Sequence, residues 1–234
     1  MRILALITAR GGSKRLPGKN IKLLGEKPLV IWSIDVLRDI TEISDILVST
    51  DDPKIADICR KAGAYVPWLR PSELSSDSSS SVDVAIHALD WYEEKKSPID
   101  GLLLIQPTSP FRTKASIKQG INLYLTHSFN PVVGVSPSHR HPMWAVKIEG
   151  DFMVPFFEKH GIGKRLQDLP PAYSVNGSFY LISPKELRAR RSFFGENTIP
   201  LIIKSQQESL DIDTQFDWNQ AEIILEIWNK FNEI

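Results

Sequence analysis

Short apolar runs alternate with longer stretches of helical periodicity along most of the chain. The apolar runs predict strands at residues 3–8, 45–49, 102–105, 132–135, 178–182 and 201–204. The periodic stretches predict helices at residues 28–37, 52–63, 81–94, 113–125 and 215–231. Strands and helices that alternate in this way form a mostly parallel central sheet with helices on both faces. We therefore expect an α/β fold.

The alternation is interrupted at residues 138–175, where the sequence predicts a hairpin around Gly150-Asp151. So short a segment cannot cover all of its own large apolar side chains, which include Trp144, Phe152, Phe156 and Phe157. Uncovered apolar side chains in one region mark a surface for a partner. We predict a single domain over residues 1–234, with an inserted lobe at 138–175 through which the protein forms a homodimer.

The composition is that of an ordinary globular protein, with 42% hydrophobic and 24% charged residues among 234 and a formal net charge of zero. A neutral chain without an extended basic face is not expected to bind nucleic acid. A single cysteine, Cys59, excludes an intramolecular disulfide framework. No apolar run approaches the roughly 20 residues of a membrane span and no signal-peptide layout is present, so we expect no membrane association and a cytoplasmic protein.

The first predicted strand leads directly into a basic, glycine-containing segment, residues 9–20. Five basic residues and no acidic residue occur from Arg10 to Lys22. Glycine lacks the Cβ atom that keeps a polyanion away from the backbone, so main-chain N–H groups and basic side chains can reach the same phosphates. The segment predicts a triphosphate-binding loop, and the alternative interpretation is a solvated basic turn.

The spacing within this loop excludes two familiar nucleotide-binding motifs. A Walker A loop has four residues between its first Gly and the Gly-Lys-Ser/Thr end, whereas Gly12 and Gly18 enclose five residues here. Asn20 also stands where the hydroxyl that binds Mg²⁺ is required. The G-x-G-x-x-G fingerprint of a Rossmann dinucleotide site is absent as well.

A second candidate site is the pair of carboxylates in Asp211-Ile212-Asp213. Residues two apart on an extended strand point to the same side, so the two carboxylates can share one cation. In nucleotide enzymes Mg²⁺ takes one or two carboxylates and completes its shell with phosphate and water. The alternative is that Asp213 or Thr214 only caps the last helix.

Three other polar segments are candidates for ligand recognition. The serine-rich loop from Arg70 to Ser81 predicts contacts to the edge of a base, or plain helix capping. Gln106 follows a buried strand, where a polar amide suits substrate recognition. Asn176-Gly177 indicates either a tight turn or a close approach to a ligand. We assign no histidine as a general base, and the nucleophile motif G-x-S-x-G is absent.

Taken together, six segments spanning nearly the whole chain point to one family. They are residues 9–20, Ser49-Thr50-Asp51, Leu69-Arg70-Pro71, Gln106-Pro107-Thr108-Ser109-Pro110, Asn176-Gly177 and Asp211-Ile212-Asp213-Thr214. In type and order they resemble the motifs of the acylneuraminate cytidylyltransferases, or CMP-N-acetylneuraminic acid synthetases, including members of the CMP-legionaminic acid synthetase type. The opening segment alone is also similar to that of the octulosonate cytidylyltransferases.

The resemblance implies a Rossmann-like nucleotidyltransferase fold, a homodimer built through the inserted lobe, and transfer of CMP from CTP to a nine-carbon 2-keto sugar acid with release of pyrophosphate. It implies that Asp211 and Asp213 bind Mg²⁺ and act in catalysis with Arg10 and Lys19. The implied nucleotide-binding residues are Ala9, Arg10, Gly11, Ser13, Lys14, Lys19, Asn20, Arg70 and Ser81. The implied substrate-binding residues are Gln106, Asn176 and Tyr180.

One departure from the family pattern concerns the sugar acid. Sialate enzymes of this kind often carry Arg-Pro-Asn-Gly where this chain has Ser174-Val175-Asn176-Gly177. Arg165, in the lobe, is a candidate to supply the missing positive charge for the sugar carboxylate, including across a dimer. Sialic, legionaminic and pseudaminic acids all fit this framework. The alternatives are an octulosonate-type cytidylyltransferase and a non-catalytic, nucleotide-binding regulatory protein.

Overall fold

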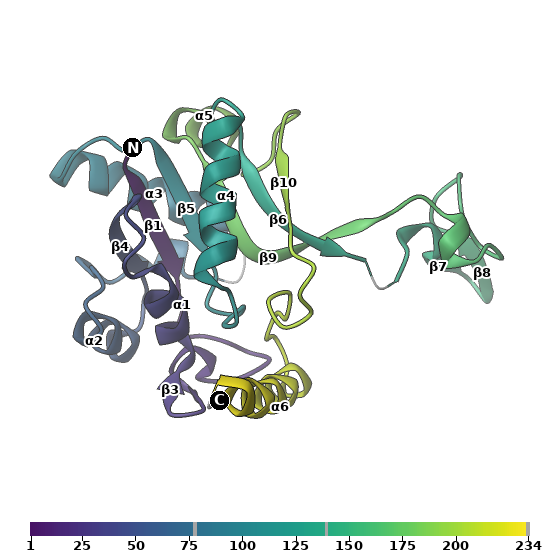
Figure 1. Ribbon diagram of the computed structural model, residues 1–234, viewed down its shortest axis with the longest axis horizontal. Helices are drawn as coiled ribbons and strands as arrows, with labels where there is room; N and C mark the ends of the chain where they lie inside the picture. The colour runs from purple at the N-terminus through teal and green to yellow at the C-terminus, as the bar shows by residue number, and fades with distance from the viewer. Residues whose placement is uncertain (77–78, 139, 233–234) are drawn as a thin grey trace.

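A central six-stranded sheet organises the protein (Figure 1). The computed structural model describes residues 1–76, 79–138 and 140–232. The strands lie in the order β10-β6-β9-β5-β1-β4. Their bounds are β1 (Ile3–Thr8), β4 (Ile43–Ser49), β5 (Gly101–Ile105), β6 (Val132–Pro137), β9 (Tyr173–Ile182) and β10 (Ile199–Ile202). Only β9 runs antiparallel to its neighbours in this sheet, so the expectation of a mostly parallel sheet is confirmed.

Helices cover both faces of the sheet because the strand side chains that point to each face are apolar. In β1, Ile3, Ala5 and Ile7 pack into one core, and Leu4 and Leu6 pack into another. The first core includes residues of α1 (Leu29–Leu37), α2 (Pro53–Lys61) and α4 (Lys114–Thr126). The second core includes residues of α3 (Ser81–Lys95) and α5 (Pro184–Arg190). These five side chains are fully buried, and burial of a Leu or Ile side chain stabilises the fold by about 1.5–3 kcal/mol.

Side-chain caps begin the helices that follow the strands. The Asp52 carboxylate accepts hydrogen bonds from two backbone N–H groups at the start of α2, and Ser80 and Thr113 do the same for α3 and α4 with one each. Pro53 stands at the first position of α2, where its missing N–H has no partner to lose. The predicted start of this helix at Asp52-Pro53 is therefore confirmed.

A third, smaller core fixes the C-terminal helix α6 (Gln215–Asn232) beneath the opening loop. Trp218 is fully buried there and packs with Leu16, Leu24 and Phe111. The short strands β2 (Leu23–Leu24) and β3 (Lys27–Pro28) pair with each other beside it. Short 3-10 helices occur at Lys19–Ile21, Ser72–Leu74, Pro142–Trp144 and Leu166–Asp168.

Several strands differ from their predicted limits because strand pairing, and not local pattern, sets their ends. β9 begins at Tyr173, since it continues to pair with β6 as far as Pro137↔Tyr173. β10 lies at Ile199–Ile202 and not at 201–204, because Ile199 pairs with Val132 at the start of β6. β4 likewise begins at Ile43, two residues before the predicted strand.

Between β6 and β9 the chain leaves the sheet and forms a lobe that stands well away from it (Figure 1). The lobe carries the antiparallel hairpin of β7 (Val146–Glu149) and β8 (Phe152–Pro155), which confirms the hairpin predicted around Gly150-Asp151. Several large apolar side chains of the lobe are exposed, among them Ile148, Phe152, Met153, Phe156 and Phe157. No helix in the described ranges is long and apolar enough to cross a membrane.

Candidate functional site

A cleft of about 650 Å³ opens between the loop after β1, the loop that leads into α3, the loop after β5 and the acidic segment of Asp211 and Asp213. The carboxyl ends of parallel strands are where open α/β sheets bind ligands. Ten of the site residues expected from the sequence line this cleft, namely Arg10, Ser13, Lys14, Lys19, Asn20, Arg70, Ser81, Gln106, Asp211 and Asp213. With Arg15, the lining contains five basic and two acidic side chains, so the cleft is suited to a polyanion.

The basic loop is held in place from its outer side. The Gly11 N–H donates to Asp51 Oδ1 at 2.9 Å, and Asn20 Nδ2 donates to the Arg10 carbonyl at 2.9 Å. A Cβ atom at Gly11 would lie 2.8 Å from Asp52 Oδ2, so the close approach of loop and helix start requires glycine. Asn20 therefore stabilises the conformation of the loop. Ala9, at the start of the loop, is fully buried.

Arg70 is fixed at the end of β4. Its Nε donates to Ser49 Oγ at 3.0 Å, and its own backbone N–H donates to the Thr50 carbonyl at 2.6 Å. Burial lowers the pKa of the Arg70 guanidinium from its ordinary value, and the nearby Asp51 carboxylate opposes that shift. The charge of Arg70 thus sits in a rigid position at the edge of the cleft.

In the serine-rich loop, helix capping and the lining of the cleft belong to different serines. Ser80 caps α3 by accepting a hydrogen bond from the Asp83 N–H at 3.0 Å. Ser81, the first residue of the helix, lines the cleft together with Ser76 and Ser79. The expected capping is therefore present at Ser80, and Ser81 is left facing the cleft. Residues 77–78 of this loop lie outside the described part of the chain.

The acidic segment, residues 211–213, lies at the cleft but does not form a strand. The prediction that these residues are an extended strand is therefore wrong. The segment is held by single contacts, one from its backbone to the loop after β5 and others from Lys19. Ile212 is fully buried, and its N–H donates to the Thr108 carbonyl at 2.8 Å. Lys19 Nζ donates to the Ile212 carbonyl at 2.7 Å. Anchoring of the central residue leaves the flanking carboxylates of Asp211 and Asp213 at the cleft.

Asp213 contacts the basic loop, and its side chain does not cap the last helix. Asp213 Oδ1 lies 3.0 Å from Lys19 Nζ, and Oδ2 lies 2.7 Å from Arg15 Nη2. Thr214 and Asp217 provide the cap, since Asp217 Oδ2 accepts from the Thr214 N–H at 2.7 Å and Thr214 Oγ1 accepts from the Asp217 N–H at 3.3 Å. Of the two capping alternatives considered for this segment, the one at Thr214 is correct.

The two cleft carboxylates fit a magnesium ion that is bound together with a nucleotide. No group of three or more His, Cys, Asp or Glu side chains in the described ranges is arranged to hold a metal by itself. Two carboxylates with phosphate and water are sufficient for Mg²⁺. The pKa of Asp211 is raised above its ordinary value, chiefly by burial and also by the Asp213 charge, although a hydrogen bond from Thr108 and the charge of Lys19 oppose the shift. A nearby cation therefore stabilises the charged form of Asp211.

Three expected substrate-binding residues do not line the cleft within one chain. Asn176 is buried, with its Nδ2 donating to Ser136 Oγ at 2.9 Å and its Oδ1 accepting from the Ser178 N–H at 3.1 Å. Tyr180 packs against Phe193, with ring centroids 5.5 Å apart, and burial and the Asp211 charge raise the pKa of its hydroxyl.

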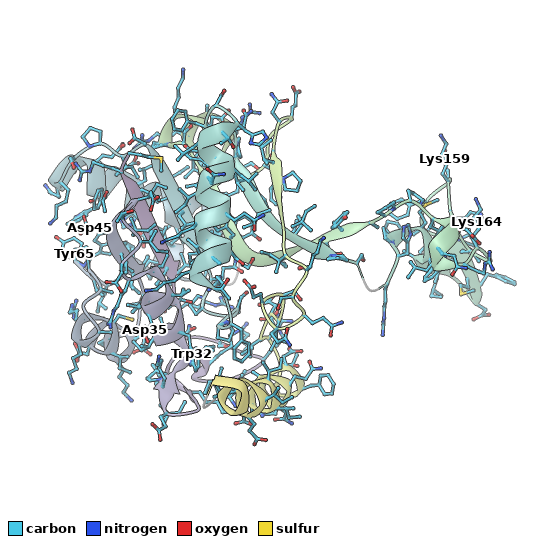
Figure 2. The ribbon with its side chains drawn as sticks, viewed as in Figure 1. Trp32, Asp35, Asp45, Tyr65, Lys159 and Lys164 are labelled. Atoms are coloured by element: carbon cyan, nitrogen blue, oxygen red, sulfur yellow. The ribbon has the colours of Figure 1, made fainter. Side chains whose placement is uncertain are left out.

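Arg165 belongs to the lobe, where its Nε lies 2.9 Å from Asp168 Oδ2. Figure 2 labels its neighbour Lys164 at the far side of the lobe from the sheet. Within a single chain, Arg165 and the cleft therefore lie in different parts of the molecule.

Sequence reasoning missed Arg112. This side chain is buried, and Nε donates to the Ser178 carbonyl at 2.6 Å, Nη1 donates to Ser33 Oγ at 3.1 Å, and Nη2 donates to the Gln106 carbonyl. Burial lowers the pKa of Arg112 to about 9, and the Asp211 carboxylate opposes this shift. An arginine in a loop is ordinarily exposed, so its position in the sequence carried no signal of burial.

A basic cleft at the carboxyl edge of a mostly parallel sheet, faced by two carboxylates suited to Mg²⁺, defines a nucleotide-binding α/β protein of the nucleotidyltransferase class. The family model described as "Cytidylyltransferase" matches residues 4–140, which contain the basic loop, Arg70 and Gln106. The chain belongs to this cytidylyltransferase family, and the family resemblance expected from its motifs is confirmed.

Two curated relatives and one solved structure agree with this assignment. The chain is 39% identical to a CMP-N,N'-diacetyllegionaminic acid synthase of Legionella pneumophila, over 97% of both chains. It is 32% identical to an N-acylneuraminate cytidylyltransferase of Streptococcus agalactiae, over 93% of this chain and 52% of that longer protein. A structure of CMP:2-keto-3-deoxy-manno-octonic acid synthetase complexed with CTP superposes with a TM-score of 0.69 at 14% identity, covering 97% of this chain and 99% of that chain. The expected nucleotidyltransferase fold is confirmed.

Proposed function

We propose that this protein transfers CMP from CTP to a nine-carbon 2-keto sugar acid of the sialic and legionaminic acid type and releases pyrophosphate. The observation that carries the proposal is the basic cleft facing Asp211 and Asp213, in a chain that belongs to the cytidylyltransferases. The cleft volume of about 650 Å³ lies within the usual range of ligand sites. The likeness along the full length to a legionaminic acid enzyme favours that acid as the first substrate to test.

In the proposed reaction, the anomeric hydroxyl of the sugar acid attacks the α-phosphorus of CTP in line with the departing pyrophosphate. Catalysis of phosphoryl-type transfer rests mainly on positioning and electrostatic stabilisation. Arg10, Lys14 and Lys19 line the cleft on one side and neutralise the charge that builds on the leaving group. Ser13 also lines the cleft, and its hydroxyl is proposed to donate to the same phosphates.

Asp211 and Asp213, which also line the cleft, would hold Mg²⁺ there. When bound there, the ion supplies Lewis-acid polarisation of the α-phosphate. Lys19 connects the basic loop to the acidic segment, because its Nζ contacts both the Ile212 carbonyl and Asp213. An alternative role for one aspartate is to accept the proton of the attacking hydroxyl.

Arg70 and Ser81 are proposed to contact cytosine, and Gln106 is proposed to contact the sugar acid. Asn176 and Tyr180 lie in β9, which pairs with β5, the strand that leads to Gln106. For Arg165 we propose a contact to the substrate carboxylate in a second copy of the chain, with the exposed apolar surface of the lobe forming the homodimer. An enzyme that consumes CTP works where CTP is made, so we place it in the cytoplasm.

The proposal is tested by measuring pyrophosphate release from CTP and Mg²⁺ with legionaminic, sialic, pseudaminic and octulosonic acids in parallel. Each product is confirmed by its mass. Release with a nine-carbon acid supports the proposal and identifies the substrate. Release with octulosonic acid alone would assign the protein to the eight-carbon sugar acids, and CTP binding without release would favour a regulatory protein.

A further inference from the structure

Arg112 joins three parts of the molecule from within the core. It stands just before α4, and its guanidinium donates to the Ser178 carbonyl in β9, to Ser33 Oγ in α1 and to the Gln106 carbonyl after β5. The side chain is 7% exposed and Ser33 is fully buried. Arg112 is not among the residues that line the cleft. Any effect of Arg112 on the reaction therefore acts through the three groups to which its guanidinium donates.

A buried charge is costly, so an arginine at this position requires a reason beyond stability. Apolar side chains of similar volume often replace buried ionic groups without loss of stability. A guanidinium, by contrast, offers five donors in a rigid planar fork and can hold several acceptors at fixed angles. Here the fork holds two backbone carbonyls and one hydroxyl, and the Asp211 carboxylate acts on its charge. The arrangement fixes geometry between segments.

The segments that Arg112 holds meet again at the Gln106 side chain. Gly177 has φ +72°, and a Cβ atom there would lie 2.8 Å from Gln106 Oε1 and 4.0 Å from Asp211 Oδ2. Gly177 directly precedes Ser178, whose carbonyl accepts from Arg112 Nε. One guanidinium thus holds both the backbone of Gln106 and the segment of β9 against which the Gln106 amide rests.

We propose that Arg112 is a positioning residue that sets the Gln106 amide for the sugar acid and leaves CTP binding untouched. The inference rests on the proposed function, because it assigns Gln106 to the sugar-acid half of the cleft. The CTP half is anchored independently, since the basic loop is held by Asp51 and Asn20. Loss of the Arg112 guanidinium should therefore weaken binding of the sugar acid without weakening binding of CTP.

The test is Arg112→Lys, which keeps the positive charge and loses the fork. We expect the KM for the sugar acid to rise at least about 10-fold, because a displacement of about 1 Å in a positioning group can cost far more than that. The dissociation constant of CTP, measured by calorimetry, should change less than about twofold. Arg38→Lys is the matched control, since Arg38 also donates to a backbone carbonyl, that of Ala62, but at the surface.

Ser33→Ala provides a second, milder variant if Arg112→Lys does not fold. Ser33 lies in α1 and is not a cleft residue, yet it accepts from Arg112 Nη1. We expect the KM for the sugar acid to rise about threefold, with CTP binding unchanged, because one of three guanidinium contacts is lost. The inference is overturned if either folded variant weakens binding of CTP and of the sugar acid equally. It is also overturned if a folded variant weakens binding of neither substrate. A wild-type protein that binds CTP but releases no pyrophosphate with any of the acids overturns the proposed function, and the inference with it.

Discussion

The sheet body and the lobe treat their apolar side chains in opposite ways. In the body, Leu4 and Leu104 are at most 1% exposed, because helices cover both sides of the strands. In the lobe, Ile148 is 70% and Phe152 75% exposed on a hairpin that pairs only with itself. The body therefore completes its core within one chain, whereas the lobe presents a surface that a second protein surface can cover. This contrast separates what one chain does alone from what we propose it does as a dimer.

The strongest test concerns chemistry in the body alone. We expect Asp213→Asn to lower turnover about 10³-fold, or ~4 kcal/mol in the barrier, because a metal ligand and a partner of Lys19 are both weakened. Steady-state pyrophosphate release at saturating Mg²⁺ measures the effect, and light scattering should find the oligomeric state unchanged. Asp151→Asn, in the exposed turn of the lobe, is the matched control. Near-normal turnover of Asp213→Asn would remove the metal assignment.

A pair of truncations measures the contrast in burial directly. Leu104→Ala leaves a cavity between the sheet and α3, and we expect it to lower the free energy of unfolding by about 2–5 kcal/mol. Ile148→Ala removes an exposed side chain from the lobe, and in the monomer we expect a change within about 0.5 kcal/mol. Urea unfolding at dilute protein measures both. Equal losses at the two positions would contradict the distinction between body and lobe.

The assembly proposed for the lobe is tested by Phe152→Asp. A charge at the centre of a buried apolar interface typically costs at least about 2 kcal/mol of binding free energy. We therefore expect the dissociation constant of the dimer to rise about 30-fold or more. Sedimentation across a concentration series measures this shift. Phe216→Asp is the matched control, because Phe216 is 70% exposed on α6, in the body. A wild-type protein that is monomeric at micromolar concentration, or equal shifts in both variants, would contradict dimerisation through the lobe.

The smallest effect separates two adjacent serines of the body. Ser80→Ala removes the cap of α3, and we expect a loss of about 1 kcal/mol in the free energy of unfolding. Ser81→Ala should leave stability unchanged and weaken CTP binding instead, because Ser81 does not cap and faces the cleft. Thermal unfolding and calorimetric titration with CTP distinguish the two variants. The reverse assignment of effects would show that the cleft role belongs to Ser80.

Much of the body was predictable because its signals are local. Short continuous apolar runs mark β1 and β5, and Asp52-Pro53 marks the start of a helix through its own hydrogen bonds. The basic loop was recognisable because glycines and cations lie together in the sequence. Ten expected site residues meet at one cleft because parallel strands bring their carboxyl ends to one edge.

The sequence by itself determined the order of elements, the two buried faces of the sheet, and the residue types that meet a nucleotide. Only the tertiary structure decided that residues 211–213 lie without a strand partner, that Arg112 is buried under Gln106, and that the lobe stands apart from the cleft. The physical reason is the range of the interactions. Periodicity and capping act within a few residues, whereas a buried charge or an unpaired segment is defined by groups that come from distant parts of the chain.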